Sequence, residues 1–74
     1  MITGAEVKTA RELLGWTRER LAAEAGLSTT AIGVCERGDQ RQSELVVDAI
    51  QDVLELAGVE FPEGAAPRLK TTAG

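Results

Sequence analysis

Residues 17–38 read TRERLAAEAGLSTTAIGVCERG, and this stretch predicts two short helices joined by a tight turn. Thr17 and Ser28 are good N-cap residues, because a side-chain hydroxyl accepts a hydrogen bond from an otherwise unsatisfied amide of the first helical turn. Gly26 stands between the two helices, where a residue in the left-handed conformation ends the first one. Two capped helices around one glycine turn are typical of a helix-turn-helix.

Apolar residues around both caps support this interpretation. Trp16 with Leu21, and Leu27 with Ile32, occupy the positions of hydrophobic staples at the two helix starts. The expected helices cover residues 18–25 and 29–36. Because the remaining apolar positions recur at helical spacing, each helix has one side that fits a core.

The longer segment LLGWTRERLAAEAGLSTTAIGVCERG, residues 13–38, resembles the helix-turn-helix of the Cro/CI-type (XRE-like) family of small bacterial and phage transcriptional regulators. Members often read L-G-W-S-Q-E-E-L-A-E-x-A-G-V-S-x-x-T-I-S-x-I-E-R-G here. The resemblance extends through a long helix to the tail GVEFPEGAAPRLK, residues 58–70. It implies an all-α, four-helix, lambda-repressor-like domain over residues 1–58, with a short hairpin or extended tail over 59–74 as a candidate dimerisation element.

The resemblance also implies how the second helix of the motif would meet double-stranded DNA. Its base-facing positions, in the major groove, are Thr29, Thr30, Gly33 and Val34. Threonine hydroxyls hydrogen-bond several bases, and threonine and valine methyl groups fit a thymine methyl. Gly33 has two interpretations. Its lack of a side chain allows the helix backbone to approach DNA closely, or it arose by drift in a helix that no longer recognises a DNA sequence.

Phosphate contacts are expected at both ends of the motif. In the family, the residue after the N-cap of the motif's first helix is commonly a glutamine that touches the DNA backbone. Arg18 stands at this position in this chain. The residue before Gly38 and the basic residues after it contact phosphates in the family. The expected phosphate-contacting residues are Thr17, Arg18, Ser28, Arg37 and Arg41.

The flanking segments predict two more helices and a tail. Thr3 and Glu6 form a capping box for a helix over about residues 4–14, and Ser43 caps a helix that runs to about Ala57. For this last helix the expected core face is Val46, Ile50, Val53, Leu54 and Ala57. Val47 and Leu56 are predicted to lie beside that face and, with the alternating tail, to form a self-interface. The expected dimerisation residues are Val47, Leu56, Val59, Phe61 and Leu69.

Composition limits the functions that remain. The 74 residues fit one small domain, and their net charge of −4 comes mainly from residues 44–62, whereas residues 1–43 are balanced. With one tryptophan and one phenylalanine, stacking of bases on an aromatic platform is not expected. No apolar run approaches the roughly 20 residues that span a bilayer, and no signal-peptide pattern opens the chain, so the cytoplasm is the expected location.

Two functional hypotheses follow from the residues and the resemblance. The first is a sequence-specific DNA-binding transcriptional regulator, repressor or activator and autoregulatory, that acts as a homodimer on inverted repeats. The second is a protein-interaction helix-turn-helix, antitoxin-like or antiactivator, that uses its acidic last helix and apolar tail. An enzyme is rejected, because the chain has no histidine, no glycine-rich phosphate loop and no nucleophile with a base. No cofactor, metal or small-molecule substrate is expected, and Cys35 is interpreted as a core residue.

Overall fold

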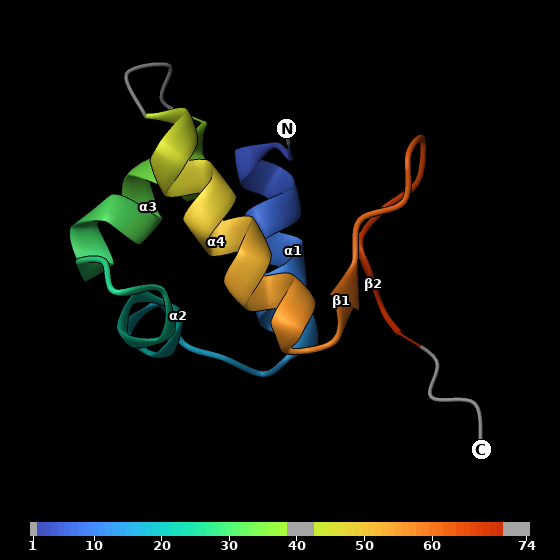
Figure 1. Cartoon of the computed structure of the whole chain (residues 1–74), viewed down its shortest axis with the longest axis horizontal. Coiled ribbons are helices and arrows are strands. Elements are labelled where there is room, and N and C mark those ends of the chain that lie inside the picture. The colour runs from blue at the N-terminus through green and yellow to red at the C-terminus, as the bar shows by residue number, and fades with distance from the viewer. Residues whose placement is uncertain (1, 39–42, 71–74) are drawn as a thin grey trace.

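The computed structural model of the chain describes residues 2–38 and 43–70, which form four helices followed by a two-stranded antiparallel sheet (Figure 1). The elements are α1 (Gly4–Leu13), α2 (Arg18–Ala25), α3 (Thr29–Arg37), α4 (Glu44–Leu56), β1 (Val59–Glu60) and β2 (Arg68–Leu69). The predicted four-helix fold with a short C-terminal hairpin is confirmed.

Local capping explains where the first helix starts and ends. The Thr3 hydroxyl accepts from the Glu6 amide at 3.1 Å, and the Glu6 carboxylate accepts from the Thr3 amide at 2.9 Å, so the predicted capping box forms. At the other end, the Trp16 amide donates to the Arg11 carbonyl at 3.1 Å. These bonds satisfy backbone groups that a helix terminus leaves without a partner.

The core is shared by all four helices and the first strand. Its buried side chains are Val7, Ala10, Leu21, Ala22, Ile32, Cys35, Val47, Ile50, Leu54 and Val59. On α4 the buried positions Val47, Ile50 and Leu54 follow a spacing of three and four residues. The prediction that Val47 lies beside the core face is therefore wrong. Because α4 is apolar on more than one side, its rotation was ambiguous in the sequence.

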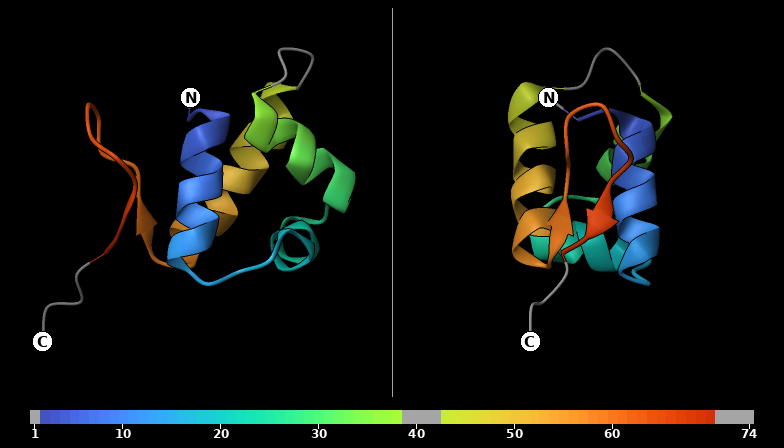
Figure 2. Two further views of the ribbon diagram at one scale, coloured as in Figure 1. Left: turned by 180° about the vertical axis from the view of Figure 1, so that it is seen from behind. Right: turned by 90° about the vertical axis from the view of Figure 1, so that its right-hand side faces the viewer.

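The hairpin packs against α1 and α4 at the end of the molecule remote from α3 (Figures 1 and 2). Val59 is fully buried and pairs with Leu69, and Glu60 pairs with Arg68 through an ion pair of 2.9 Å. The Lys70 amide donates to the Gly58 carbonyl at 2.7 Å. A hairpin this short is held by such packing, because it would not persist alone in water.

The start of α1 lies against the end of α3, and Gly4 makes that approach possible. A Cβ atom at Gly4 would overlap the Cys35 carbonyl oxygen and would lie 2.9 Å from both the Glu36 carbonyl oxygen and the Gly38 amide nitrogen. All three are backbone atoms, which cannot rotate away. Only glycine therefore fits where these two helices meet.

Candidate nucleic-acid interface

The helix-turn-helix is built as its local sequence predicts. The Thr17 hydroxyl accepts from the Arg20 amide at 3.1 Å, and the Ser28 hydroxyl accepts from the Ala31 amide at 3.1 Å, so both caps form. Gly26 adopts a left-handed φ of 69°, and the next amide, that of Leu27, donates to the Ala22 carbonyl at 2.9 Å. This closure ends α2 and turns the chain directly into α3.

One side of α3 faces the core and the other faces solvent. Ile32 and Cys35 are buried, whereas Thr29 and Thr30 are exposed and Val34 is half-buried. The outward side thus carries hydroxyl and methyl groups over the first two turns of the helix. No charged side chain precedes Glu36 on this helix.

Gly33 is buried, unlike the two threonines. The nearest side-chain atom to the place that a Cβ would occupy is Nη1 of Arg37, at 3.7 Å, which is an ordinary van der Waals distance. The Arg37 side chain therefore lies beside this part of the helix. The space around Gly33 would accept an alanine without displacement.

The five predicted phosphate-contacting residues differ in their surroundings. Thr17 and Ser28 use a hydroxyl lone pair for capping, which leaves each hydroxyl hydrogen to donate elsewhere. The Arg37 side chain is exposed and makes no ion pair or hydrogen bond with any described residue. Arg18 is engaged with Glu36, and Arg41 lies outside the described residues.

A buried carboxylate joins the three N-terminal helices, and sequence reasoning did not assign it a role. Glu36 on α3, whose side chain is 2% exposed, accepts from Nε of Arg11 at 2.7 Å and from Nε of Arg18 at 3.0 Å. Arg11 also donates from Nη2 to Glu36 at 3.3 Å and from Nη1 to the Trp16 carbonyl at 2.9 Å. We call Arg11, Arg18 and Glu36 the carboxylate clamp.

Electrostatics keep this carboxylate ionised. Burial by itself raises the pKa of Glu36, but hydrogen bonds and charge from Arg11 and Arg18 outweigh it and hold the pKa below its ordinary value. The same hydrogen bond raises the pKa of Arg11. One signal in the sequence was available: Glu36 is four residues after Ile32, on the inward side of α3, where an acid needs cationic partners.

The comparisons with known proteins agree with this geometry. A family model described as a helix-turn-helix domain matches residues 3–63. A protein of Bacillus subtilis (strain 168), named as an uncharacterized HTH-type transcriptional regulator, YazB, is 32% identical over 60 residues, which cover 81% of this chain and 87% of the relative. This chain belongs to the XRE-like helix-turn-helix family. The recognition made from residues 13–38 is thereby confirmed.

In this member of the family, another arginine of α2 is used locally. Arg20 donates from Nε to Glu24 at 2.9 Å, one helical turn later, and its guanidinium lies 4.7 Å from the centre of the Trp16 ring. Both partners of this ion pair are about half exposed. Contacts of this kind stabilise a solvated helix face weakly.

The predicted dimerisation residues divide into two groups. Val47 and Val59 belong to the core of the single chain, so they are not free to meet another subunit. Leu56 is 90% exposed, Leu69 is 47% exposed, and Phe61 is half-buried. Leu56 also borders a surface groove that Trp16 and Val53 help to line.

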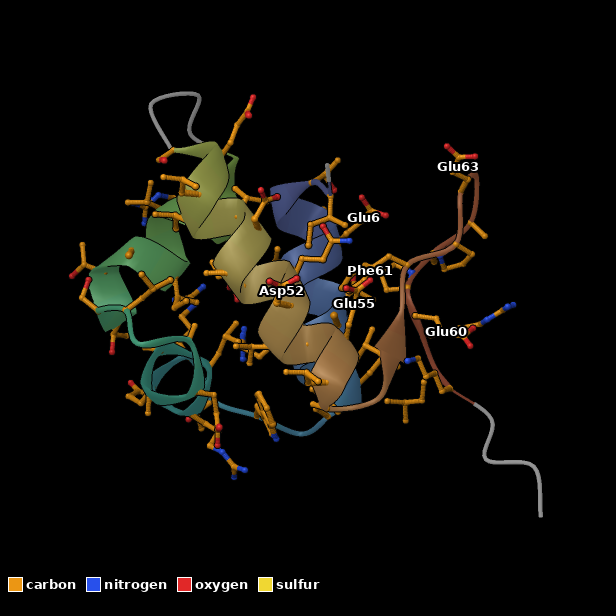
Figure 3. The ribbon with its side chains drawn as sticks, in the orientation of Figure 1. Glu6, Asp52, Glu55, Glu60, Phe61 and Glu63 are labelled. Carbon is orange, nitrogen blue, oxygen red and sulfur yellow. The ribbon has the colours of Figure 1, made fainter. Side chains whose placement is uncertain are left out.

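Acidic side chains without a matching number of basic ones are found on α4. This helix has four acidic residues and no basic one, whereas the two acids of the hairpin are matched in number by Arg68 and Lys70. Figure 3 shows Asp52 and Glu55 on α4, and Glu60 and Glu63 on the hairpin. Asp52 and Glu63 make no ion pair with a described residue. The negative net charge therefore comes mainly from α4, and residues 17–38 of the helix-turn-helix are balanced.

Cys35 behaves as a small apolar residue of the family core. Its side chain is buried, and burial together with the nearby Glu36 charge raises the pKa of the thiol. Within the described residues, no three metal-ligating side chains come together, and no helix is long and apolar enough to cross a membrane.

Proposed function

We propose that this chain is a sequence-specific, DNA-binding transcriptional regulator that places α3 in the major groove. The observation that carries the proposal is the solvent-facing side of α3, where Thr29, Thr30 and Val34 offer hydroxyl and methyl groups to base edges. Membership of the helix-turn-helix family and the name of the Bacillus subtilis relative support it. A regulator of this kind would repress by occupying a promoter, or activate by also contacting polymerase.

Phosphates would be bound around this helix. Arg37 is an exposed guanidinium at the end of α3, and the Thr17 and Ser28 hydroxyls lie at the starts of α2 and α3. Such contacts set the register of a protein on DNA, while base contacts set specificity. With about four to six phosphates bound per dimer, log K is expected to fall with log salt at a slope near −4 to −5.

The test is selection of duplexes from a random-sequence library by the purified chain, followed by gel-shift titration at several salt concentrations. Arg37→Ala is expected to lower the magnitude of the salt slope by about two per dimer. Arg20→Ala, which removes the same charge from the solvated face of α2, is the matched control. If the wild-type chain enriches no duplex at low salt, the proposal is wrong.

We further propose that the chain binds an inverted repeat as a homodimer through the end of α4 and the hairpin. Exposed Leu56 and Leu69 support this surface, because a second copy would remove their apolar side chains from water. Two recognition helices would then lie about 34–36 Å apart, one turn of DNA.

Sedimentation equilibrium tests the dimer. Leu56→Glu is expected to produce a monomer with weaker binding to the repeat. Leu45→Glu is the control, because Leu45 is 80% exposed at the opposite end of the same helix. Equal dimerisation of the two variants would contradict this surface.

A second candidate function is binding of a partner protein through the outer face of α4. Its support is that Leu45 and Leu56 are exposed beside Asp48 and Asp52. An affinity-purification experiment after nuclease treatment distinguishes the two functions. A stoichiometric protein that is lost in Leu45→Glu would favour this candidate.

A further inference from the structure

The carboxylate clamp has one member that is only partly buried. The side chains of Glu36 and Arg11 are 2% and 12% exposed, whereas that of Arg18 is 48% exposed. Arg11 alone supplies two hydrogen bonds to Glu36, one to each carboxylate oxygen. The fold therefore has a complete buried ion pair without Arg18, and the contact between Arg18 and Glu36 calls for another explanation.

The bond made by Arg18 fixes the direction of its guanidinium. Nε of Arg18 donates to Oε1 of Glu36 at 3.0 Å, and neither Nη atom has a hydrogen-bond partner among the described residues. A guanidinium is planar, so one bond at Nε to a fixed acceptor sets where the two Nη groups point. These two Nη groups can donate parallel hydrogen bonds to two oxygens of one phosphate.

The Glu36 carboxylate that accepts from Arg18 is held in place by a second arginine. Glu36 is bound by Arg11, which in turn binds the Trp16 carbonyl at 2.9 Å. Arg20, on the same helix, offers a comparison: its acceptor Glu24 is 44% exposed and, among the described residues, has no second cation within ion-pair distance. Of these two arginines, only Arg18 binds a carboxylate that is buried and held in place by a second ion pair.

We propose that Glu36 is a positioning residue for phosphate binding, which orients the guanidinium of Arg18 toward the DNA backbone. This role rests on the proposed function. A long side chain that is ordered before binding loses less conformational entropy when the phosphate arrives. The charges also suit it, because one carboxylate between two guanidiniums leaves a net positive charge at the site.

The experiment measures affinity for a duplex selected by the wild-type chain and for a scrambled duplex of the same composition. Arg18→Lys keeps the charge but lacks the planar fork, so it is expected to weaken binding of the selected duplex about tenfold. The expected salt slope is that of wild type. Arg20→Lys is the matched control and is expected to bind as wild type does.

A double-mutant cycle then separates positioning from stability. In a Glu36→Gln background, one neutral amide oxygen replaces the two charged oxygens that Arg11 and Arg18 share, so Arg18 is held less firmly and Arg18→Lys is expected to cost less than twofold there. A purely structural role of Glu36 predicts instead the same cost of Arg18→Lys in both backgrounds. Thermal unfolding of each variant confirms that affinities are compared between folded proteins.

Each remaining outcome also decides the matter. If Glu36→Gln does not fold, Arg18→Lys and Arg20→Lys still carry the test, since the pair of Arg11 with Glu36 is intact in both. Equal affinities of these two variants would overturn the role of Glu36 while leaving the proposed function in place. If the wild-type chain selects no duplex, the proposed function fails, and the positioning role fails with it.

Discussion

The contact between the start of α1 and the end of α3 predicts opposite effects for the same substitution at two helical glycines. In Gly4→Ala, the new methyl group would overlap the Cys35 carbonyl oxygen and lie 2.9 Å from two more backbone atoms. The helices must separate to admit it, and overpacking of this kind costs about 1–3 kcal/mol. In Gly33→Ala, the methyl group would lie 3.7 Å from Nη1 of Arg37, the one side-chain atom of the described residues within 4 Å.

The magnitudes translate into melting temperatures. For a domain of this size, about 1 kcal/mol shifts the midpoint by roughly 4–8 °C. Gly4→Ala is therefore expected to melt about 5–20 °C below wild type. Gly33→Ala is expected to melt about 4–8 °C above it, because alanine favours a helix interior over glycine by about 1 kcal/mol.

Circular dichroism of the three proteins, at one protein concentration, measures both shifts. Equal stability of Gly4→Ala and wild type would refute the close approach of α1 to α3. Gly33→Ala carries a second measurement, its affinity for the selected duplex. A more stable variant with weaker binding would mean that the backbone at Gly33 approaches DNA, whereas unchanged binding would favour drift at this position.

Three further predictions concern the core and the carboxylate clamp. Because the folded-state pKa of Glu36 lies below its unfolded value of about 4.3, its ion pairs stabilise the fold fully above that pH, and this stabilisation is lost as the pH falls through the folded-state pKa. The difference in unfolding free energy between wild type and Glu36→Gln is expected to shrink on acidification, and a constant difference in urea titrations would contradict this. Cys35, buried and with a raised pKa, is expected to react with an aromatic disulfide reagent only as fast as the chain unfolds, and rapid reaction of the native protein would show an accessible thiol. Leu54→Ala is expected to cost about 2–5 kcal/mol, and Leu45→Ala to stay within about 0.5 kcal/mol of wild type, because these leucines are 0% and 80% exposed. Similar losses in denaturant titrations would mean that the burial is wrong.

How much of this molecule was predictable depends on the distance in sequence over which each feature acts. The caps at Thr17 and Ser28 and the turn at Gly26 need only the next few residues, and all three form as predicted. The contact of Gly4 with α3 joins residues more than thirty positions apart, so no local sequence pattern predicts it. Val47 was misplaced because α4 has more apolar positions than one face requires.

The candidate interface follows the same division. Its outward threonines were predicted from the resemblance to the family, and helical spacing placed Ile32 and Cys35 on the apolar side of the same helix. The clamp was not, because Arg11, Arg18 and Glu36 come from three helices and only packing brings them together. The contacts of these residues with DNA stay predictions.

The concentration of unmatched acidic side chains on α4 has a consequence for the search along a chromosome. Because α4 has four acidic residues and no basic one, the field of DNA opposes collisions led by this helix more than collisions led by α3, which belongs to the balanced stretch of residues 17–38. With a net charge of −4, the chain would also be held only briefly by arbitrary sequence. A short residence time at non-specific sites returns the protein quickly to free diffusion.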